Sequence, residues 1–204
     1  MSYLKKELKF IHITKCAGSF IEELGIKHGL KWGRFHEEYG LEVGSWHDYF
    51  IDKPYSLKEK YEWFVIIRNP YDRILSEYYC KWGGIGDTNI VHNKIQFNHF
   101  IMNQIKNRSK RYWKYHYSEQ YKYIDKNCSI TIIKYENLRN ELPELFKKYD
   151  LNIEVNFSEK VNSRENYNNS QPFNTSDFSN ELIKYINEIY HEDFIIGNYE
   201  KIEI

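Results

Sequence analysis

Three short apolar runs, each followed by a helical pattern, constrain the fold of this chain more than any other feature of its sequence. The runs are rich in β-branched and aromatic residues, as buried strands are, and they cover residues 10–13, 63–67 and 130–133. The helical patterns cover residues 19–28, 71–82, 137–149 and 178–190. Because strands that alternate with helices usually pair in parallel, we expect an α/β fold with a mainly parallel central sheet flanked by helices.

The charges of the chain are balanced, with 29 Lys and Arg residues against 29 Asp and Glu residues. Proteins that bind nucleic acid or anionic membranes usually carry a basic excess, so neither partner is expected and any anion site should be local. The chain has 204 residues, of which 18% are aromatic, and this is enough for one packed domain. Since no repeat or boundary divides the sequence, we expect a single domain over residues 1–204.

The cysteines and the apolar stretches bear on the compartment. Cys16, Cys80 and Cys128 are odd in number and lack the CxxC spacing, which favours free thiols over a disulfide framework or a zinc site. The first nine residues lack the apolar stretch of a signal peptide, and no run of about 18 apolar residues occurs. These features predict a cytoplasmic protein without a membrane span.

The segment between the first apolar run and the first helical pattern has the composition of a phosphate-binding loop, and it reads Lys15-Cys16-Ala17-Gly18-Ser19. Small residues let the backbone approach a ligand, and N–H groups at a helix N-terminus favour phosphate oxygens. Lys15 adds a positive charge and Ser19 a hydroxyl donor. The segment is not a Walker A loop, because there the Lys follows the last Gly. An ordinary strand–turn–helix junction with an exposed Lys has the same pattern, so the loop alone leaves both interpretations open.

A second segment points to a second phosphate. The apolar run at residues 63–67 leads into Arg68, and a helical pattern begins after Pro70. Open α/β sheets bind ligands at the carboxyl ends of their strands, where Arg68 can fork two phosphate oxygens while Ser76 donates a third hydrogen bond. Arg73 and Glu77 stand four residues apart, and for them we expect an ordinary helical ion pair.

With these two segments in this order, the sequence resembles the sulfotransferases that use 3′-phosphoadenosine 5′-phosphosulfate (PAPS). Within them it is similar to the carbohydrate branch, which includes the heparan 2-O- and chondroitin-type enzymes. The family patterns are approximately hxHhPKTGGTSh for the 5′-phosphosulfate loop and FxhVRNPYxRhhSxY for the 3′-phosphate element. This chain reads FIHITKCAGSF from Phe10 and FVIIRNPYDRILSEY from Phe64. It departs from the family at Thr14, where Pro is usual, and at Cys16, where Thr or Gly is usual.

The resemblance implies a P-loop-like nucleotide-binding fold, PAPS as the co-substrate, 3′-phosphoadenosine 5′-phosphate (PAP) as the product, and no metal. It implies in-line transfer of a sulfuryl group to an acceptor hydroxyl, with Lys15 stabilising the leaving phosphate. The implied nucleotide-binding residues come from the two segments and from a late polar loop, and they are Lys15, Cys16, Ala17, Gly18, Ser19, Phe20, Arg68, Ser76, Ser163 and Arg164.

The acceptor hydroxyl needs a general base, for which His is suited because its usual pKa lies near the working pH. His47 and His36 both lie between the two nucleotide segments, the interval in which the family carries its catalytic His. We favour His47, since its neighbours Trp46 and Asp48 resemble the family loop and Asp48 can orient an imidazole. His36 is the alternative. His12 falls in the first predicted strand, where we expect it to pack or to form a hydrogen bond.

A tract of aromatic and basic residues at 111–123 could stack on sugar rings and pair with acidic glycans, although a Tyr-rich stretch that covers the core has the same composition. Within it, His116 and Gln120 resemble a family segment near the acceptor. We expect a saccharide hydroxyl as the acceptor and leave lipid-linked sugars, small metabolites and tyrosine peptides open. Two other functions remain: a nucleotide kinase on a related fold, and a nucleotide-binding protein without catalysis.

Overall fold

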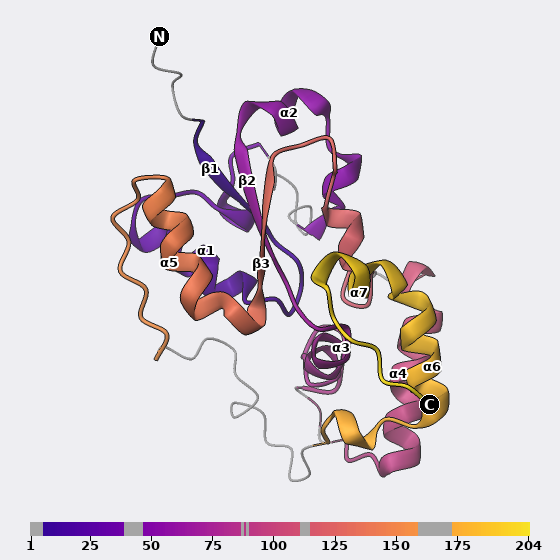
Figure 1. The fold of residues 1–204 in the computed structure, drawn as a ribbon. Coiled ribbons are helices and arrows are strands. Elements are labelled where there is room, and N and C mark those ends of the chain that lie inside the picture. Colours follow the sequence, from indigo (N-terminus) through magenta and orange to yellow (C-terminus); the bar gives the residue numbers. More distant parts are fainter. Residues whose placement is uncertain (1–5, 39–46, 87, 89, 111–114, 159–172) are drawn as a thin grey trace. The chain divides into compact units, whose positions relative to one another are not determined.

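The computed structural model describes residues 6–38, 47–86, 88, 90–110, 115–158 and 173–204 (Figure 1). The chain divides into two compact units: Met1–Ile67 with Lys122–Val161 form the first, and Arg68–Tyr121 with Asn162–Ile204 form the second. Each unit is described by itself, and the single domain over residues 1–204 stays a prediction. Among the described residues, no helix combines the length and the apolar character that crossing a membrane requires.

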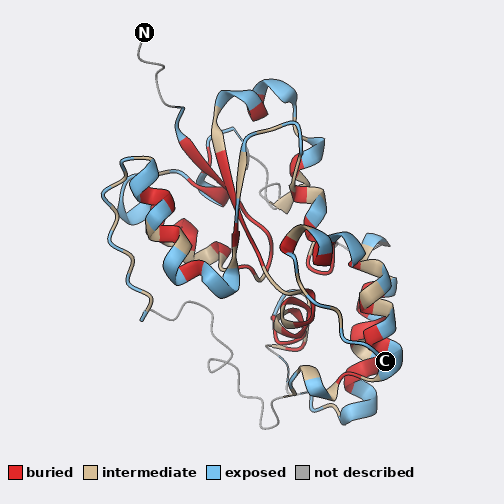
Figure 2. Ribbon diagram, viewed as in Figure 1, coloured by how far each residue is buried: buried red, intermediate tan, exposed pale blue. Residues whose placement is uncertain are grey.

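The first unit is built on a parallel sheet of three strands in the order β1–β2–β3 (Figure 1). The strands are β1 (Leu8–Ile11), β2 (Glu62–Ile67) and β3 (Ile130–Lys134). Phe10 pairs with Phe64 across β1 and β2, and Val65 pairs with Ile132 across β2 and β3. The apolar residues of β2 are fully buried, as is typical of a central parallel strand covered on both faces (Figure 2). The α/β class and the parallel sheet are therefore confirmed.

Aromatic side chains cover both faces of this sheet. Successive residues of a strand point to opposite faces, so Trp63 and Phe64 belong to different layers. The ring of Phe64 lies 5.2 Å from that of Trp32, which stacks on Phe146 at 5.5 Å. On the other face, the ring of Trp63 lies 4.9 Å from that of Phe50. The high aromatic content of the sequence thus fills the core of the first unit.

The first unit contains the helices α1 (Gly18–Lys27), α2 (Tyr55–Lys60) and α5 (Leu138–Lys148). Helices α1 and α5 follow the predicted pattern, and α2 lies in the connection before β2. Short 3-10 turns lie at Gly33–Phe35, Phe50–Asp52 and Tyr135–Asn137. The first strand differs from the prediction, because it begins and ends two residues earlier than residues 10–13. His12 and Ile13 follow the strand and lead into the turn before α1, which changes the role that His12 can have.

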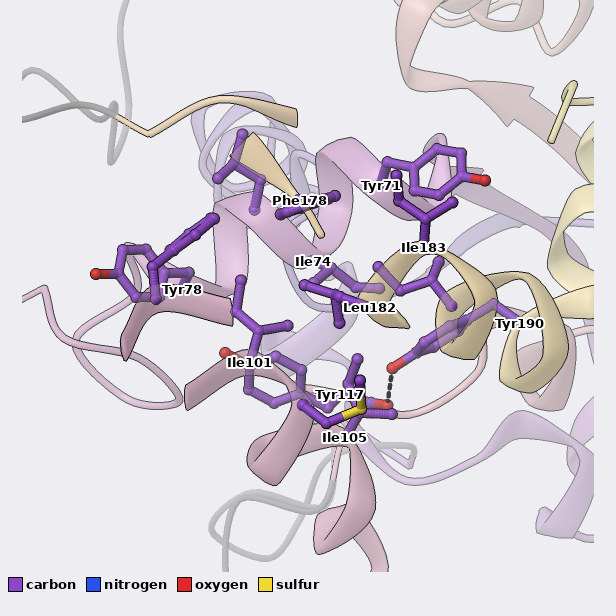
Figure 3. Close-up of a cluster of buried hydrophobic side chains, with 14 of the residues drawn as sticks. Tyr71, Ile74, Tyr78, Ile101, Ile105, Tyr117, Phe178, Leu182, Ile183 and Tyr190 are labelled. Carbon is purple, nitrogen blue, oxygen red and sulfur yellow. Dashed lines mark hydrogen bonds between the residues drawn. The ribbon is translucent and has the colours of Figure 1, made fainter. Parts of the chain in front are cut away.

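Helices surround a hydrophobic cluster in the second unit, and they are α3 (Pro70–Tyr78), α4 (Lys94–Lys106), α6 (Asn180–Ile189) and α7 (His191–Gly197). Further 3-10 turns lie at Arg108–Lys110, Gln120–Tyr123 and Thr175–Asp177. Figure 3 shows Ile74 of α3, Ile101 of α4 and Leu182 of α6 converging in this cluster, where each is fully buried. The hydroxyl of Tyr190 donates a hydrogen bond of 2.6 Å to the carbonyl of Tyr117 (Figure 3).

The end of α3 corrects the prediction of a helix over residues 71–82, because the helix stops at Tyr78. The chain then folds back on the helix end: the N–H of Gly84 donates to the carbonyl of Cys80 at 2.8 Å, and that of Ile85 donates to the carbonyl of Tyr78 at 2.8 Å. A Cβ atom at Gly84 would lie 2.0 Å from the carbonyl oxygen of Tyr78. A glycine at position 84 is therefore required by this close approach.

Helix α4 lies outside the four helical patterns predicted from the sequence, so residues 94–106 were missed. Two signals were present. Asn93 and Gln96 form a capping box, in which each side chain accepts from the backbone N–H of the other. Phe97 and Ile101 then follow at helical spacing and are fully buried.

Candidate functional site

The loop that follows β1 has an unusual backbone. Lys15 and Ala17, on either side of Cys16, both adopt left-handed conformations, with φ of 61° and 60°. For a residue with a side chain this conformation costs roughly 1–2 kcal/mol, and such residues persist mainly at functional sites. Where left-handed and right-handed residues alternate, successive N–H groups turn toward one concave side and bind anions. The loop therefore contains two residues in the left-handed conformation that occurs in anion-binding turns.

Helix α1 begins directly after this loop and contributes its N-terminus. Its N-cap residue, Ala17, makes no side-chain hydrogen bond to the helix, and no acidic residue stands in the first turn. In the second unit, by contrast, Asn69 caps α3 and Ser179 caps α6 through side-chain oxygens. The first-turn N–H groups of α1, with the half-buried Ser19 among them, are thus directed at the place where an anion would lie.

The other predicted residues of the loop differ in their surroundings. Cys16 is fully buried, and its N–H makes a long hydrogen bond of 3.4 Å to the carbonyl of Ile13. Lys15 is half-buried. Phe20 is also half-buried, and its ring stacks on that of Phe157 at 5.7 Å. The thiol of Cys16 therefore belongs to the core, while Lys15 and Phe20 reach the surface.

Replacing Ala17 by Gly is expected to raise the free energy of unfolding by about 1 kcal/mol, because Gly adopts the left-handed conformation without strain and is also a better N-cap than Ala. Ala17→Val should have the opposite effect, since a β-branched side chain fits this conformation worse than Ala. Urea unfolding of the two variants measures both changes. Equal stability of wild type and Ala17→Gly would contradict the left-handed conformation at this residue.

The turn after β1 also brings two histidines together in the first unit. His12 is buried, and its Nδ1 lies 2.7 Å from Oε1 of Glu22 on α1. The rings of His12 and His47 lie 4.6 Å apart, edge to face at 87°. The hydroxyl of Tyr123 donates a hydrogen bond of 2.8 Å to the carbonyl of His47. His47, which is half-buried, thus lies against the residue that follows the carboxyl end of β1.

His36 lies elsewhere in this unit. Its ring stacks on Trp63 at 5.6 Å and meets Tyr61 edge to face at 5.2 Å, beside the amino end of β2. Its Nδ1 accepts a hydrogen bond of 3.0 Å from the N–H of Glu38. Burial, helped by the charge of Lys9, lowers the pKa of His36 to about 4. A group with this pKa is a weak base at neutral pH, and the amino end of a parallel sheet is not where such folds bind ligands.

Asp48 forms an ion pair with Lys53, whose Nζ lies 2.9 Å from Oδ2 of the aspartate. The predicted role of Asp48 in orienting the imidazole of His47 stays a prediction. Trp46, Ser163 and Arg164 lie outside the described residues, as do residues 111–114 of the aromatic tract.

Arg68 and Ser76 belong to the second unit. Arg68 directly follows β2 in the chain, and the side-chain amide of Gln120 holds its backbone from both sides: the N–H of Arg68 donates to Oε1 at 2.9 Å, and Nε2 donates to the Arg68 carbonyl at 2.9 Å. Gln120 in turn donates its own N–H to Asp193 at 2.8 Å. Burial raises the pKa of Asp193 to about 6. Ser76 is half-buried on α3. The position of Arg68 therefore depends on Gln120 and Asp193, which the sequence reading did not identify as its partners.

Arg73 and Glu77 are both buried and contact other groups, which corrects the expectation of an ordinary helical ion pair between them. Arg73 donates to the carbonyls of Ser118 and His116, at 2.8 and 3.2 Å. Glu77 pairs with His116, whose Nδ1 lies 2.8 Å from its Oε2. Burial alone would lower the pKa of His116, but Glu77 and the nearby Cys80 raise it to about 10. These residues anchor the segment at 115–120 to α3.

The described part of the aromatic tract lies mainly in the core. Tyr117 and Tyr123 are almost fully buried, and so are His116 and Gln120. Tyr121 is the exposed ring among residues 115–123. These residues therefore cover the core, which was the alternative interpretation of the tract, and they do not form a continuous sugar-binding surface.

Comparison with protein families identifies the family of this chain. A family model described as the sulfotransferase family matches residues 4–200, which is nearly the whole chain. No curated protein and no solved structure matches the chain. The match includes the loop after β1 and the Arg68 segment, and it does not resolve the branch of the family. The chain belongs to the sulfotransferase family and is a PAPS-dependent sulfotransferase.

Proposed function

We propose that this enzyme transfers the sulfuryl group of PAPS to a saccharide hydroxyl, with His47 as the general base and Lys15 as the cation that stabilises the leaving phosphate. The observation that carries the proposal is the pair of left-handed residues before α1, together with the contact between His47 and His12 at the carboxyl end of β1. An anion-binding loop and a candidate base in the same unit are the two parts that sulfuryl transfer requires.

The 5′-phosphosulfate is assigned to the loop. The first-turn N–H groups of α1 and the hydroxyl of Ser19 supply hydrogen-bond donors, and Lys15 supplies a positive charge. In the transfer step, the acceptor oxygen attacks sulfur while the bond between sulfur and the bridging oxygen of PAPS breaks. Negative charge then develops on the 5′-phosphate of PAP, and Lys15 stabilises it there.

The proton of the acceptor hydroxyl is assigned to His47. As the new sulfur–oxygen bond forms, the hydroxyl becomes more acidic, and a neutral imidazole within hydrogen-bond distance can accept its proton. The position of His36 at the amino end of β2 and its low pKa support His47 over this alternative. The saccharide class of the acceptor rests on the resemblance to the carbohydrate branch, and sulfate transfer from labelled PAPS to a panel of oligosaccharides, sugar lipids, metabolites and tyrosine peptides tests it.

The 3′-phosphate is assigned to Arg68 and Ser76, with Ser163 and Arg164 as further donors on the resemblance. The guanidinium of Arg68 can bind two oxygens of one phosphate, and the backbone of this residue is held by Gln120. The wild-type protein should bind PAP in calorimetry and should prefer it to ATP, whereas a nucleotide kinase would show the opposite preference.

Replacing Arg68 by Ala is expected to weaken PAP binding roughly tenfold to a hundredfold, because the 3′-phosphate loses a charge-assisted, two-point contact. Titration calorimetry with PAP measures the change. Adenosine 5′-phosphate, which differs from PAP only in lacking the 3′-phosphate, is the matched control ligand, and its affinity should stay within about twofold. An unchanged dissociation constant for PAP would remove Arg68 from the 3′-phosphate site.

A further inference from the structure

The buried side chains of His12 and Glu22 are held together by a hydrogen bond in a defined geometry. The side chain of Glu22 is fully buried, and Oε1 lies 2.7 Å from Nδ1 of His12. The same carboxylate accepts the N–H of Arg34 at 2.7 Å, and Oε2 lies 3.3 Å from Nε of Arg34. With the carboxylate of Glu22 as the acceptor, the hydrogen bond requires the proton to lie on Nδ1 of His12. Glu22 thus fixes both the orientation of the imidazole and the nitrogen that carries the proton.

The opposite edge of the imidazole lies against the anion-binding loop. A Cβ atom built on Gly18 would lie 2.2 Å from Nε2 of His12, so only Gly leaves room for the ring. Gly18 and Glu22 are four residues apart on α1 and therefore lie on the same face of the helix. The imidazole of His12, which follows β1, therefore contacts both residues of the helix. These contacts connect the chain before and after the turn that contains the left-handed Lys15 and Ala17.

The same ring also contacts His47, with 4.6 Å between the ring centroids at an angle of 87°. One imidazole therefore contacts the first turn of α1 and the candidate base at once. A rotation of the His12 ring would open space beside Gly18 and remove the edge-to-face support of His47. The carboxylate of Glu22, held in turn by Arg34, opposes that rotation.

We infer that Glu22 and His12 form a positioning pair, in which the hydrogen bond between them fixes the imidazole of His12 and, through it, the place of His47 relative to the anion-binding loop. The assignment rests on the proposed role of His47 as the base. His12 and Glu22 are positioning residues here, and neither is given a part in bond making.

The first test uses long-range nitrogen–proton NMR. It measures the tautomer and the chemical shifts of the histidine rings in the wild-type enzyme and in Glu22→Gln. We expect the proton of neutral His12 on Nδ1 in the wild type. In Glu22→Gln we expect displaced imidazole signals for both His12 and His47. Glu23→Gln removes a carboxylate from the next position of the same helix and should leave both sets of signals in place. A wild-type His12 with its proton on Nε2, or His47 signals unchanged in Glu22→Gln, overturns the inference.

The second test separates positioning from binding and from stability. Glu22→Gln keeps the size of the side chain but loses a charge-assisted hydrogen bond, so kcat for sulfuryl transfer should fall at least about tenfold. The dissociation constant of PAP should stay within about threefold, and Glu22→Asp, which restores the charge, should recover part of kcat. A wild-type kcat in Glu22→Gln, or a loss that follows thermal stability alone across the variants, overturns the inference.

The two tests also distinguish failure of the inference from failure of the proposed function. If the wild-type protein neither binds PAP nor transfers sulfate, the proposed function fails, and the NMR comparison still decides whether Glu22 controls the rings of His12 and His47. If the wild-type enzyme is active while Glu22→Gln matches it in kcat and in the His47 signals, only the inference fails.

Discussion

Replacing His47 by Ala is expected to lower kcat for sulfuryl transfer roughly a hundredfold to ten-thousandfold, the usual contribution of a positioned general base. The acceptor hydroxyl then has to lose its proton to water. PAP should still bind with nearly wild-type affinity, because the donors assigned to its phosphates lie elsewhere: on the loop after β1, at Arg68 and at Ser76. Transfer from labelled PAPS to the best acceptor of the panel gives the rate, and calorimetry gives the affinity.

Two histidine variants serve as controls for this result. His36→Phe keeps an aromatic ring against Trp63 and should retain transfer, since His36 lies beside the amino end of β2. His99→Ala changes an exposed residue of α4 and should be neutral. Full activity in His47→Ala would remove His47 as the general base. Loss of transfer in His36→Phe with the fold intact would instead assign the base to His36.

The second large effect is expected at Lys15. Lys15→Met keeps the aliphatic stem and the left-handed strain but removes the charge, so kcat should fall roughly a hundredfold to a thousandfold, as when one donor to a developing oxyanion is lost. The free energy of unfolding should hardly change, because the charge of a half-buried Lys adds little to stability.

Lys27→Met, on the last turn of α1, is the matched control for this charge and should retain transfer. Donors with a better leaving group provide a further check: a donor whose leaving group is more acidic depends less on a cation, so the loss in Lys15→Met should shrink with it. A loss of the same size for every donor would mean that Lys15 acts in binding and not on the leaving group.

The predictable parts of the fold were those that a local pattern determines. Residues 63–67 form a continuous apolar run rich in β-branched and aromatic residues, which is typical of a central strand of a parallel sheet. Arg68 and Pro70 follow that strand directly, so the strand end and the helix start could be placed from the sequence. Helix α4 could have been placed in the same way, since Asn93 and Gln96 carry a capping signal and Phe97 and Ile101 carry the spacing.

Tertiary contacts were not predictable in this way. Arg73 and Glu77 have the spacing of an exposed ion pair, but the segment that carries His116 covers α3 and buries both side chains. The contact between His12 and His47 joins residues 35 positions apart, and no periodicity encodes it. Left-handed φ values at Lys15 and Ala17 were likewise hidden, because neither residue type favours that conformation and only the surrounding fold imposes it.

The strained loop has a consequence for the order of events in catalysis. Because the fold imposes the left-handed residues, the N–H groups proposed to bind the 5′-phosphosulfate are oriented before any nucleotide arrives. The entropy of ordering these groups is lost when the polypeptide folds and is not lost again in each turnover. Under the proposed mechanism, nucleotide exchange therefore needs no rearrangement of residues 15–17.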